Sequence, residues 1–489
     1  MLLGGGQYDK KKKVLSLILS GIVCSSLILT GCANSKEEES KETVNLTWYV
    51  IGDEPTDNDI VEEEVNKYLK DKINATVDIK HIPFGDYTKK MSVISNSGEP
   101  YDLAFTCSWA FPYLEYARKG AFLELNDLLD TEGAPLKKEI NKELWKGAEI
   151  DGKIYAVPNQ KEIALAPMWV FDKELVEKYN IPYEDIHSVN DLGPWLKLIK
   201  EKEPDFIPFY THGDSIPLDF DDIVNPLGIF YNDKSLTVTN KFESKEMKDM
   251  LLKLREYYEA GYINQDAAVT DMKPEVKRFV WKADGQPYAE NIWGKSLGRE
   301  VVTSSIIPPY ITNNSTTGAM TAISANSKHP KKAMELLTLV NTDTTLRNLL
   351  MFGIEGKHYE KINDKQIKKF DGKKYDVVSW AYGNLLGTYV SENDPIDKWD
   401  AFEKFNNSAK VSPILGFKFN TENVSNQISA INNVLQEFER ALYTGSIDPE
   451  VGLNDLNKKL NDSGINEVKE EIQKQLNEWK AKIISVINK

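Results

Sequence analysis

Val44-Asn45-Leu46-Thr47-Trp48-Tyr49-Val50 alternates apolar and polar side chains, which is the pattern of a half-buried strand. A helical pattern follows over residues 60–69, and a second strand-like stretch follows over residues 76–82. Apolar residues then recur at helical spacing over residues 84–94, and residues 101–105 have the composition of a short buried strand. Strands that alternate with helices predict a parallel α/β fold. Such a fold binds ligands at the carboxyl ends of its strands.

The rest of the chain continues this alternation and then becomes helical. We expect strands at residues 154–158, 167–171 and 319–324 and helices at 173–179, 251–258 and 330–340. Near the C-terminus, residues 424–438 and 468–479 each carry an apolar stripe at helical spacing, which we expect to face a core rather than a partner. A chain of 489 residues is too long for one ordinary core, so two or three domains are expected.

The N-terminus has the layout of a secretory signal. Four lysines, Lys10 to Lys13, precede the apolar stretch from Val14 to Thr30. The stretch ends in Leu29-Thr30-Gly31-Cys32, which resembles the lipobox of bacterial lipoproteins. That resemblance implies that residues 1–31 are a signal peptide, that cleavage occurs before Cys32, and that the Cys32 thiol carries diacylglycerol. The alternative is an uncleaved anchor helix, but a membrane span takes about 20 mostly apolar residues and this stretch is shorter.

The remaining composition narrows the classes of function. Residues 32–43 are polar and lack aromatic side chains, so they predict a disordered tether between anchor and globular body. The formal net charge of −15 disfavours nucleic acid and anionic lipid surfaces as partners. Cleavage would remove Cys24 and lipidation would consume Cys32, so Cys107 would have no disulfide partner and is expected to be a small buried residue.

Four stretches in order resemble the extracellular solute-binding proteins of ABC importers, family 1, which includes maltodextrin-binding proteins. They are the segment from Pro100-Tyr101-Asp102 to Phe122-Leu123-Glu124-Leu125, the segment from Asp151-Gly152-Lys153 to Lys173-Glu174-Leu175, Asn291-Ile292-Trp293-Gly294, and the segment from Ile323 to Ala333. The C-terminal region, about residues 411–489, resembles an extra, uncharacterised domain of a Firmicutes lipoprotein branch.

The resemblance implies a two-lobe α/β periplasmic-binding-protein type II fold with a hinge, plus a C-terminal helical extension. Lobe 1 would comprise residues 44–158 and 315–360, and lobe 2 would comprise residues 159–314 and 361–489. The ligand would lie in the cleft between the lobes, which would close by a hinge motion.

A sugar needs planar aromatic rings beside polar groups in a concave pocket, and the chain has 10 Trp and 22 Tyr. The resemblance places ligand contacts at the loop after the first strand, at a strand end, at the lobe crossover and in the lobe 2 segment. Tyr288 and Glu290 are spaced so that they could share one strand face with Trp293. The candidate ligand-binding residues are Asp53, Glu54, Trp109, Asn159, Glu162, Tyr288, Glu290 and Trp293. The alternative is that the aromatic residues are core and the acidic residues are solvated.

Signals for catalysis and for metals are weak. Gly294-Lys295-Ser296 lacks the first glycine of a P-loop, the five histidines are scattered, and Asp219-Phe220-Asp221-Asp222 lacks the glycine and terminal glutamate of an EF-hand. We therefore expect no catalytic residue, no metal and no cofactor.

The prediction is a lipid-anchored solute-binding component on the outer face of the cell membrane, which passes an oligosaccharide to ABC permease subunits. The alternatives are an anchored glycoside hydrolase, which needs two suitably spaced carboxyl groups, and a sensor or adhesion lipoprotein that does not take part in transport.

Overall fold

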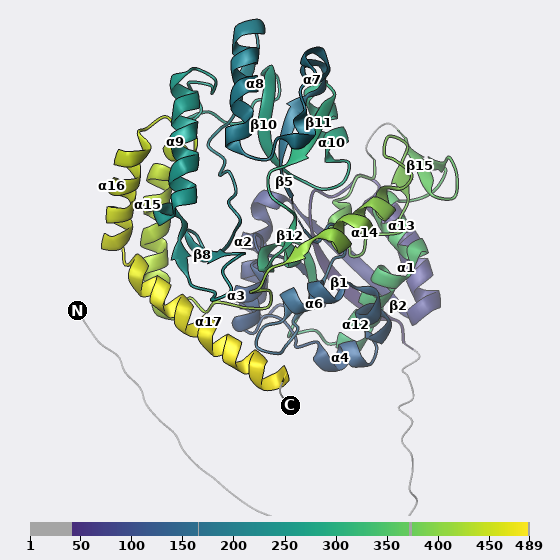
Figure 1. Ribbon diagram of the computed structural model, residues 1–489. Coiled ribbons are helices and arrows are strands. Elements are labelled where there is room, and N and C mark those ends of the chain that lie inside the picture. Colours follow the sequence, from purple (N-terminus) through teal and green to yellow (C-terminus); the bar gives the residue numbers. More distant parts are fainter. Residues whose placement is uncertain (1–41, 165, 371–373, 488–489) are drawn as a thin grey trace, which may run out of the picture. The chain divides into compact units, whose positions relative to one another are not determined.

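The predicted strand–helix alternation forms a five-stranded sheet in the computed structural model, which describes residues 42–164, 166–370 and 374–487 (Figure 1). Its strand order is β2-β1-β3-β13-β4. The strands are β1 (Val44–Ile51), β2 (Ala75–Ile82), β3 (Leu103–Thr106), β4 (Ala156–Pro158) and β13 (Met320–Ile323). β1 pairs in parallel with β2 and β3, whereas β13 is antiparallel to β3 and β4. The predicted parallel α/β start is therefore confirmed, and one later strand enters the same sheet in the opposite direction.

The alternation in β1 points Leu46, Trp48 and Val50 into the interior, where they are buried. Helices pack around this sheet to form the first core. They are α1 (Asn58–Ile73), α2 (Phe84–Ser97), α3 (Tyr113–Arg118), α4 (Asn126–Asp130), α5 (Ala134–Glu139), α6 (Lys142–Ala148), α11 (Asn313–Thr316), α12 (Pro330–Thr342), α13 (Thr344–Phe352) and α14 (Lys398–Ser408). In α1 the buried residues Val61, Val65 and Leu69 recur every four positions, as expected for one face of a helix.

A second, four-stranded sheet forms the centre of the second core, with the order β11-β5-β10-β6. The strands are β5 (Ala166–Asp172), β6 (Ile207–Phe209), β10 (Arg278–Gly285) and β11 (Val301–Ser305). The associated helices are α7 (Lys173–Tyr179), α8 (Val189–Lys202), α9 (Lys245–Glu259) and α10 (Ala289–Leu297). Trp169 and Phe171 of β5 face the second core, while Val170 between them joins a small separate cluster with Trp281 and Val301. This alternation shows that both faces of the second sheet are covered.

Within the described residues the chain passes between the two cores three times: between residues 164 and 169, between 306 and 311, and between 409 and 414. Hydrogen bonds at or beside these crossings join them to one another. The Asn406 side chain accepts from the Ile163 backbone N–H at 2.8 Å and donates to the Lys161 carbonyl at 2.9 Å. A short parallel pair, β12 (Tyr310–Ile311) with β17 (Lys410–Val411), joins the second and third crossings. Three bonded crossings are the physical form that a hinge between two lobes would take.

Two small sheets lie outside the main ones. One contains β7 (Phe220–Val224), β8 (Leu227–Phe230) and β9 (Thr239–Asn240), and the other contains β14 (Tyr359–Lys361), β15 (Gln366–Lys369) and β16 (Val390–Ser391).

The C-terminal helices complete the second core. They are α15 (Ser425–Tyr443), α16 (Pro449–Asp462) and α17 (Ile465–Ile487), and α15 and α16 lie alongside α9 in Figure 1. Ile431 and Leu435 of α15 and Ile472 and Leu476 of α17 are buried. Both apolar stripes therefore face the core, as predicted.

The predicted division gave residues 361–489 to lobe 2, but the structure differs for the first part of this range. Tyr375 and Tyr382 are buried in the first core, where the Tyr382 ring lies 5.4 Å from that of Trp48. Buried residues join the second core from Ile414, apart from Leu415. Apolar composition predicts that a residue is buried, but it does not show which of the two cores the residue joins. The other predicted lobe boundaries stay a prediction.

Cys32, the signal peptide and nearly all of the predicted tether lie outside the described residues. In the part of the chain that is described, no helix is long and apolar enough to cross a membrane.

Candidate functional site

Three aromatic rings meet at the carboxyl end of β3 and form what we call the aromatic platform: Phe84, Trp109 and Trp380. Trp109 follows β3, and Phe84 begins α2. The Phe84 and Trp109 rings are stacked at 6.2 Å, and Trp380 meets Trp109 edge-on at 6.0 Å. The buried ring of Phe105 lies beneath both tryptophans. Phe84 is 50% exposed and Trp109 is 52% exposed. Large rings held in contact yet left open to solvent have the form of a stacking surface for an apolar ligand face.

Hydrogen bonds fix the platform to the first sheet. The Trp109 indole N–H donates to the Gly318 carbonyl at 3.1 Å. Asn159, which follows β4, donates its side-chain N–H to the Trp380 carbonyl at 2.9 Å and accepts from the Thr321 hydroxyl at 3.4 Å. Asn159 lies at the expected crossover but is buried, and its side chain anchors the segment that carries Trp380.

A pocket of about 530 Å³, the platform pocket, adjoins Trp109. Its lining includes Trp109, Glu162, Pro308, Tyr310, Asp222 and Tyr443. These residues come from the first core, from two crossings and from the second core. Trp109 and Glu162 are thus the two predicted site residues that the structure brings into one pocket.

The carboxylates that line the platform pocket are paired with lysines. Glu162 forms an ion pair with the neighbouring Lys161, and Asp222 lies 2.9 Å from the Lys241 ammonium. Tyr231 stacks face to face on Tyr310 at 3.6 Å. The pocket therefore offers flat apolar surfaces together with charged hydrogen-bonding groups.

Asp221, the neighbour of Asp222 on β7, is buried and accepts a hydrogen bond from the Ser412 hydroxyl. Removal from water raises the pKa of Asp221 to about 6, because burial disfavours the charged carboxylate. This strand of the second core is thereby bonded to the segment that follows the third crossing.

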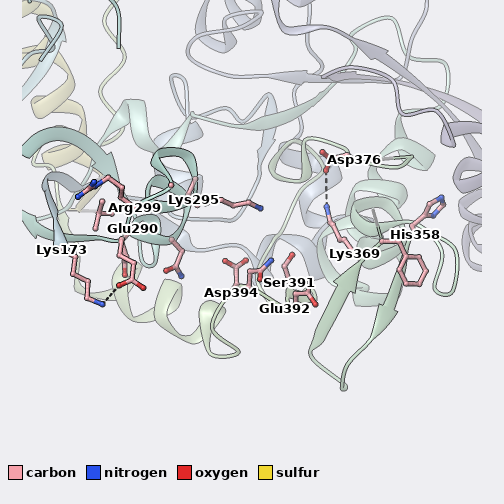
Figure 2. Close-up of a pocket in the computed structure, with 18 of the residues that line it drawn as sticks. Lys173, Glu290, Lys295, Arg299, His358, Lys369, Asp376, Ser391, Glu392 and Asp394 are labelled. Carbon is pink, nitrogen blue, oxygen red and sulfur yellow. Dashed lines mark hydrogen bonds and ion pairs between the residues drawn. The ribbon is translucent and has the colours of Figure 1, made fainter. Parts of the chain in front are cut away.

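A larger hollow of about 1400 Å³, the charged groove, contains Glu290 (Figure 2). One side is formed by α10 and the start of β11, and the other side is formed by residues of the segment from 357 to 394. Figure 2 shows Glu290, Lys295 and Arg299 on the first side and Lys369, Asp376 and His358 on the second. The Lys369 ammonium lies 3.3 Å from the Asp376 carboxylate. This groove is more polar than the platform pocket, and its aromatic residues are Phe370 and Tyr375.

The predicted strand face at residues 288–293 is wrong. Glu290 and Trp293 lie on helix α10, and Tyr288 is the left-handed residue just before it, with φ 65°. β10 ends at Gly285, and Pro287, which has no backbone N–H to donate to a strand ladder, follows two residues later. The Tyr288 hydroxyl donates to Asp397 at 3.0 Å, and Trp293 packs half-buried against the cluster of Val170, Trp281 and Val301.

Asp53 and Glu54 are exposed in the loop between β1 and α1, as predicted for that loop. This loop lies against the segment that leads to Trp380. A Cβ added to Gly52 would come within 2.8 Å of the Val378 side chain, and the Asp57 N–H donates to the Lys374 carbonyl at 3.0 Å.

Sequence reasoning missed Phe84, Tyr310 and Trp380. Phe84 was assigned to a helix only, and Trp380 lies in a short 3-10 turn, Ser379–Ala381, without periodicity. A signal was present in the aromatic richness of residues 375–382, but sequence alone does not show which strand end this segment reaches.

Cys107 is buried, and burial raises the pKa of its thiol to about 11, in agreement with the prediction of an inert residue. Among the residues that the structure describes, no three His, Cys, Asp or Glu side chains are grouped to hold a metal ion.

Comparison with known proteins gives two family matches. The model described as bacterial extracellular solute-binding protein matches residues 52–345, and a domain of unknown function, DUF3502, matches residues 413–481.

Relatives and solved structures agree with the first match. A carbohydrate ABC transporter substrate-binding protein from Streptococcus pneumoniae serotype 4 is 36% identical over 489 residues, which cover 96% of this chain and 99% of the relative. Lipoprotein LipO of Bacillus subtilis is 23% identical over 277 residues, 53% of this chain and 52% of the relative.

A crystal structure of the N-glycan transport solute binding protein (NgtS) from Streptococcus pneumoniae is 36% identical and gives a TM-score of 0.82, with 89% of this chain and 98% of that chain covered. Structures of that protein in complex with Man1GlcNAc and Man5GlcNAc give 0.71 and 0.68.

Proposed function

Because the chain belongs to the bacterial extracellular solute-binding protein family, we propose that it captures an oligosaccharide at the aromatic platform and delivers it to the permease of an ABC importer. The observation that carries the proposal is the solvent-exposed stack of Phe84 on Trp109 beside a pocket built from both cores. Pyranose rings have apolar C–H faces that pack on such rings, while their hydroxyls bond to polar groups at the edge. The glycans bound by the NgtS relative support this class of ligand.

Capture would use the three bonded crossings as a hinge. The platform pocket takes residues from both cores, so a ligand that touches both would stabilise one relative position of the two. Asp53 and Glu54 would supply polar contacts beside Trp380 from the loop after β1. Glu162 would do so from the first crossing.

We propose binding without turnover. The pocket carboxylates of Glu162 and Asp222 each face a lysine, whereas a glycosidase needs one carboxyl group to hold a proton for the leaving group. The two Streptococcus pneumoniae proteins described above, the carbohydrate ABC transporter substrate-binding protein and NgtS, are named as binding proteins, which supports the same conclusion.

The direct test is calorimetric titration of the soluble body, residues 44–489, with Man1GlcNAc and Man5GlcNAc, and with a peptide mixture as the comparison ligand. We expect saturable binding of a glycan and a higher melting temperature, because a ligand that binds only the native state stabilises it by mass action. The glycan should be recovered intact afterwards. Hydrolysis of the glycan would favour the hydrolase alternative, and binding of the peptides alone would overturn the carbohydrate proposal.

We further propose that Cys32 carries diacylglycerol and holds the protein on the outer face of the membrane. The lipobox-like sequence and the similarity to Lipoprotein LipO support this anchor. Two acyl chains are sufficient for stable anchoring. Cys32→Ala should accumulate as unprocessed precursor that incorporates no labelled fatty acid, whereas normal processing and labelling of that variant would contradict the anchor.

A further inference from the structure

The segment between the two family matches connects the aromatic platform to the charged groove. Residues 346–412 are matched by neither family model. Within them, the described residues 352–370 and 374–397 include β14, β15, β16 and the 3-10 turn that carries Trp380, and they have little other regular structure. A stretch of this kind keeps one conformation only if other parts of the molecule hold its backbone.

Buried polar groups of the first core hold the backbone of residues 352–370 and 374–397 at several points. The Arg347 guanidinium donates to the carbonyls of Asn384 at 3.1 Å and Leu386 at 2.8 Å. Arg347 is buried, and burial lowers the pKa of its guanidinium, because removal from water disfavours the charged form. The Leu385 N–H donates to the Gln160 carbonyl at 2.8 Å, and Asn159 holds the Trp380 carbonyl. The same short region after β4 therefore fixes this stretch at two successive points.

The stretch contributes to the aromatic platform and to the charged groove. Trp380 contributes its ring to the aromatic platform, and residues 357–358, 369–370, 374–376 and 391–394 line the charged groove opposite α10. Asp376 in the groove wall and Trp380 are four residues apart, so their Cα atoms are separated by at most about 14 Å. The loop with Asp53 and Glu54 lies against the chain between them, because Gly52 lies against Val378.

We propose that residues 352–370 and 374–397 are the specificity-determining segment: Trp380 binds the first sugar at the platform, and the groove wall with Phe370 contacts only ligands long enough to reach it. This inference rests on the proposed function and adds which part of the chain selects ligand length. Phe370 is the groove residue best suited to a sugar face, since it is aromatic and 39% exposed.

The test compares two variants, each with a matched control. Trp380→Ala removes a half-buried tryptophan from the platform, and Trp145→Ala removes a half-buried tryptophan from α6, outside both hollows. Phe370→Ala removes an exposed apolar side chain from the groove. Ile362→Ala removes one that is 51% exposed on the same β14–β15 hairpin and does not line the groove. Each protein is titrated calorimetrically with Man1GlcNAc and Man5GlcNAc, and its melting temperature is measured without ligand.

We expect Trp380→Ala to weaken both glycans about tenfold or more, and Phe370→Ala to weaken Man5GlcNAc about three- to tenfold with Man1GlcNAc unchanged. Both controls should bind like the wild type. If the wild type binds these glycans and Phe370→Ala affects both equally or neither, the length selection is overturned. A Trp380→Ala protein that melts lower but binds normally would show a structural role only. A wild type that binds neither glycan would instead overturn the proposed function itself.

Discussion

Trp109 and Trp293 were predicted as equivalent ligand contacts on the two sides of one cleft, yet the structure uses them differently. Trp109 is 52% exposed and stacks with Phe84, while its indole N–H bonds the Gly318 carbonyl. Trp293 lies on α10 and packs on the small cluster of Val170, Trp281 and Val301. Trp109 lies in the loop after β3, whereas Trp293 lies within a helix, so the two positions are not equivalent. A ring faces solvent where no neighbouring element covers it.

The comparison predicts that Trp293→Ala has its main effect on stability. The indole contributes to the only apolar cluster described on that face of the second sheet, and a Cβ on Gly285 would lie 2.8 Å from it. We expect the free energy of unfolding to fall by about 2–3 kcal/mol, since the side chain is only half-buried. Chemical denaturation monitored by circular dichroism measures this. A stability within about 0.5 kcal/mol of the wild type would mean that Trp293 is a ligand contact like Trp109.

The β7 strand, which forms part of the second-core side of the platform pocket, makes the stability of the fold depend on pH through Asp221. Burial raises the pKa of Asp221 to about 6, above its value in the unfolded chain. The folded state therefore holds this proton more tightly, and the stability that the group contributes is complete below about pH 4 and is lost as the pH rises through about 6. Asp222 on the same strand, Tyr231, and Lys418 from the C-terminal segment are the other groups that bear on this carboxyl.

In the Asp221→Asn variant the side chain cannot ionise, so the loss of stability with rising pH should disappear. At pH 7.5 we expect the variant to be more stable than the wild type by about 2 kcal/mol, with the difference disappearing near pH 4. Asp222→Asn is the matched control, because its carboxylate is half-exposed and paired with Lys241. Unfolding titrations at several pH values give the measurement, and a constant difference across that range would show that Asp221 is charged in the fold at all of them.

Trp109→Ala tests the platform side. We expect the Kd for the glycan to rise about tenfold, which corresponds to about 1.4 kcal/mol, because a stacking surface is lost. The stability should change by less than about 1 kcal/mol, since half of the ring is already in water. Titration and denaturation of the same sample separate the two effects. An unchanged Kd with lower stability would place Trp109 with Trp293 as a structural residue.

Periodicity predicted most of the fold because it reports which side of an element is buried. The helix expected at residues 173–179 is α7 within the same bounds, and the expected strand at 76–82 is β2 (Ala75–Ile82). The lobe division that the resemblance implied failed where burial depends on distant segments. Tyr375 and Tyr382 were expected in lobe 2 and lie in the first core, because contacts from residues such as Arg347 decide where that stretch is held.

The candidate site was predicted only in part, because sequence position does not show which distant segments meet at the site. Trp109 and Glu162 line one pocket, as a position at a strand end or a crossover favours. Glu290 lines the charged groove, but from a helix and not from the expected strand face. Asn159 has the expected position but is buried, and both ends of its amide are bonded inside the protein. Trp380 was missed because it reaches the platform from a part of the chain that is distant in sequence.

The smallest expected effect concerns the loop that lies between the two sides. Glu54 is exposed and has no ordered partner that would fix its carboxylate, so a contact to a sugar hydroxyl would be paid for by ordering the side chain. Glu54→Gln keeps the size and one acceptor, and we expect the Kd to rise only about twofold, equivalent to about 0.4 kcal/mol. Glu63→Gln, an exposed change on α1, is the control. If Glu54→Gln weakened binding as strongly as Trp109→Ala, the loop rather than the platform would dominate recognition, and the contrast between Trp109 and Trp293 would no longer explain where affinity arises.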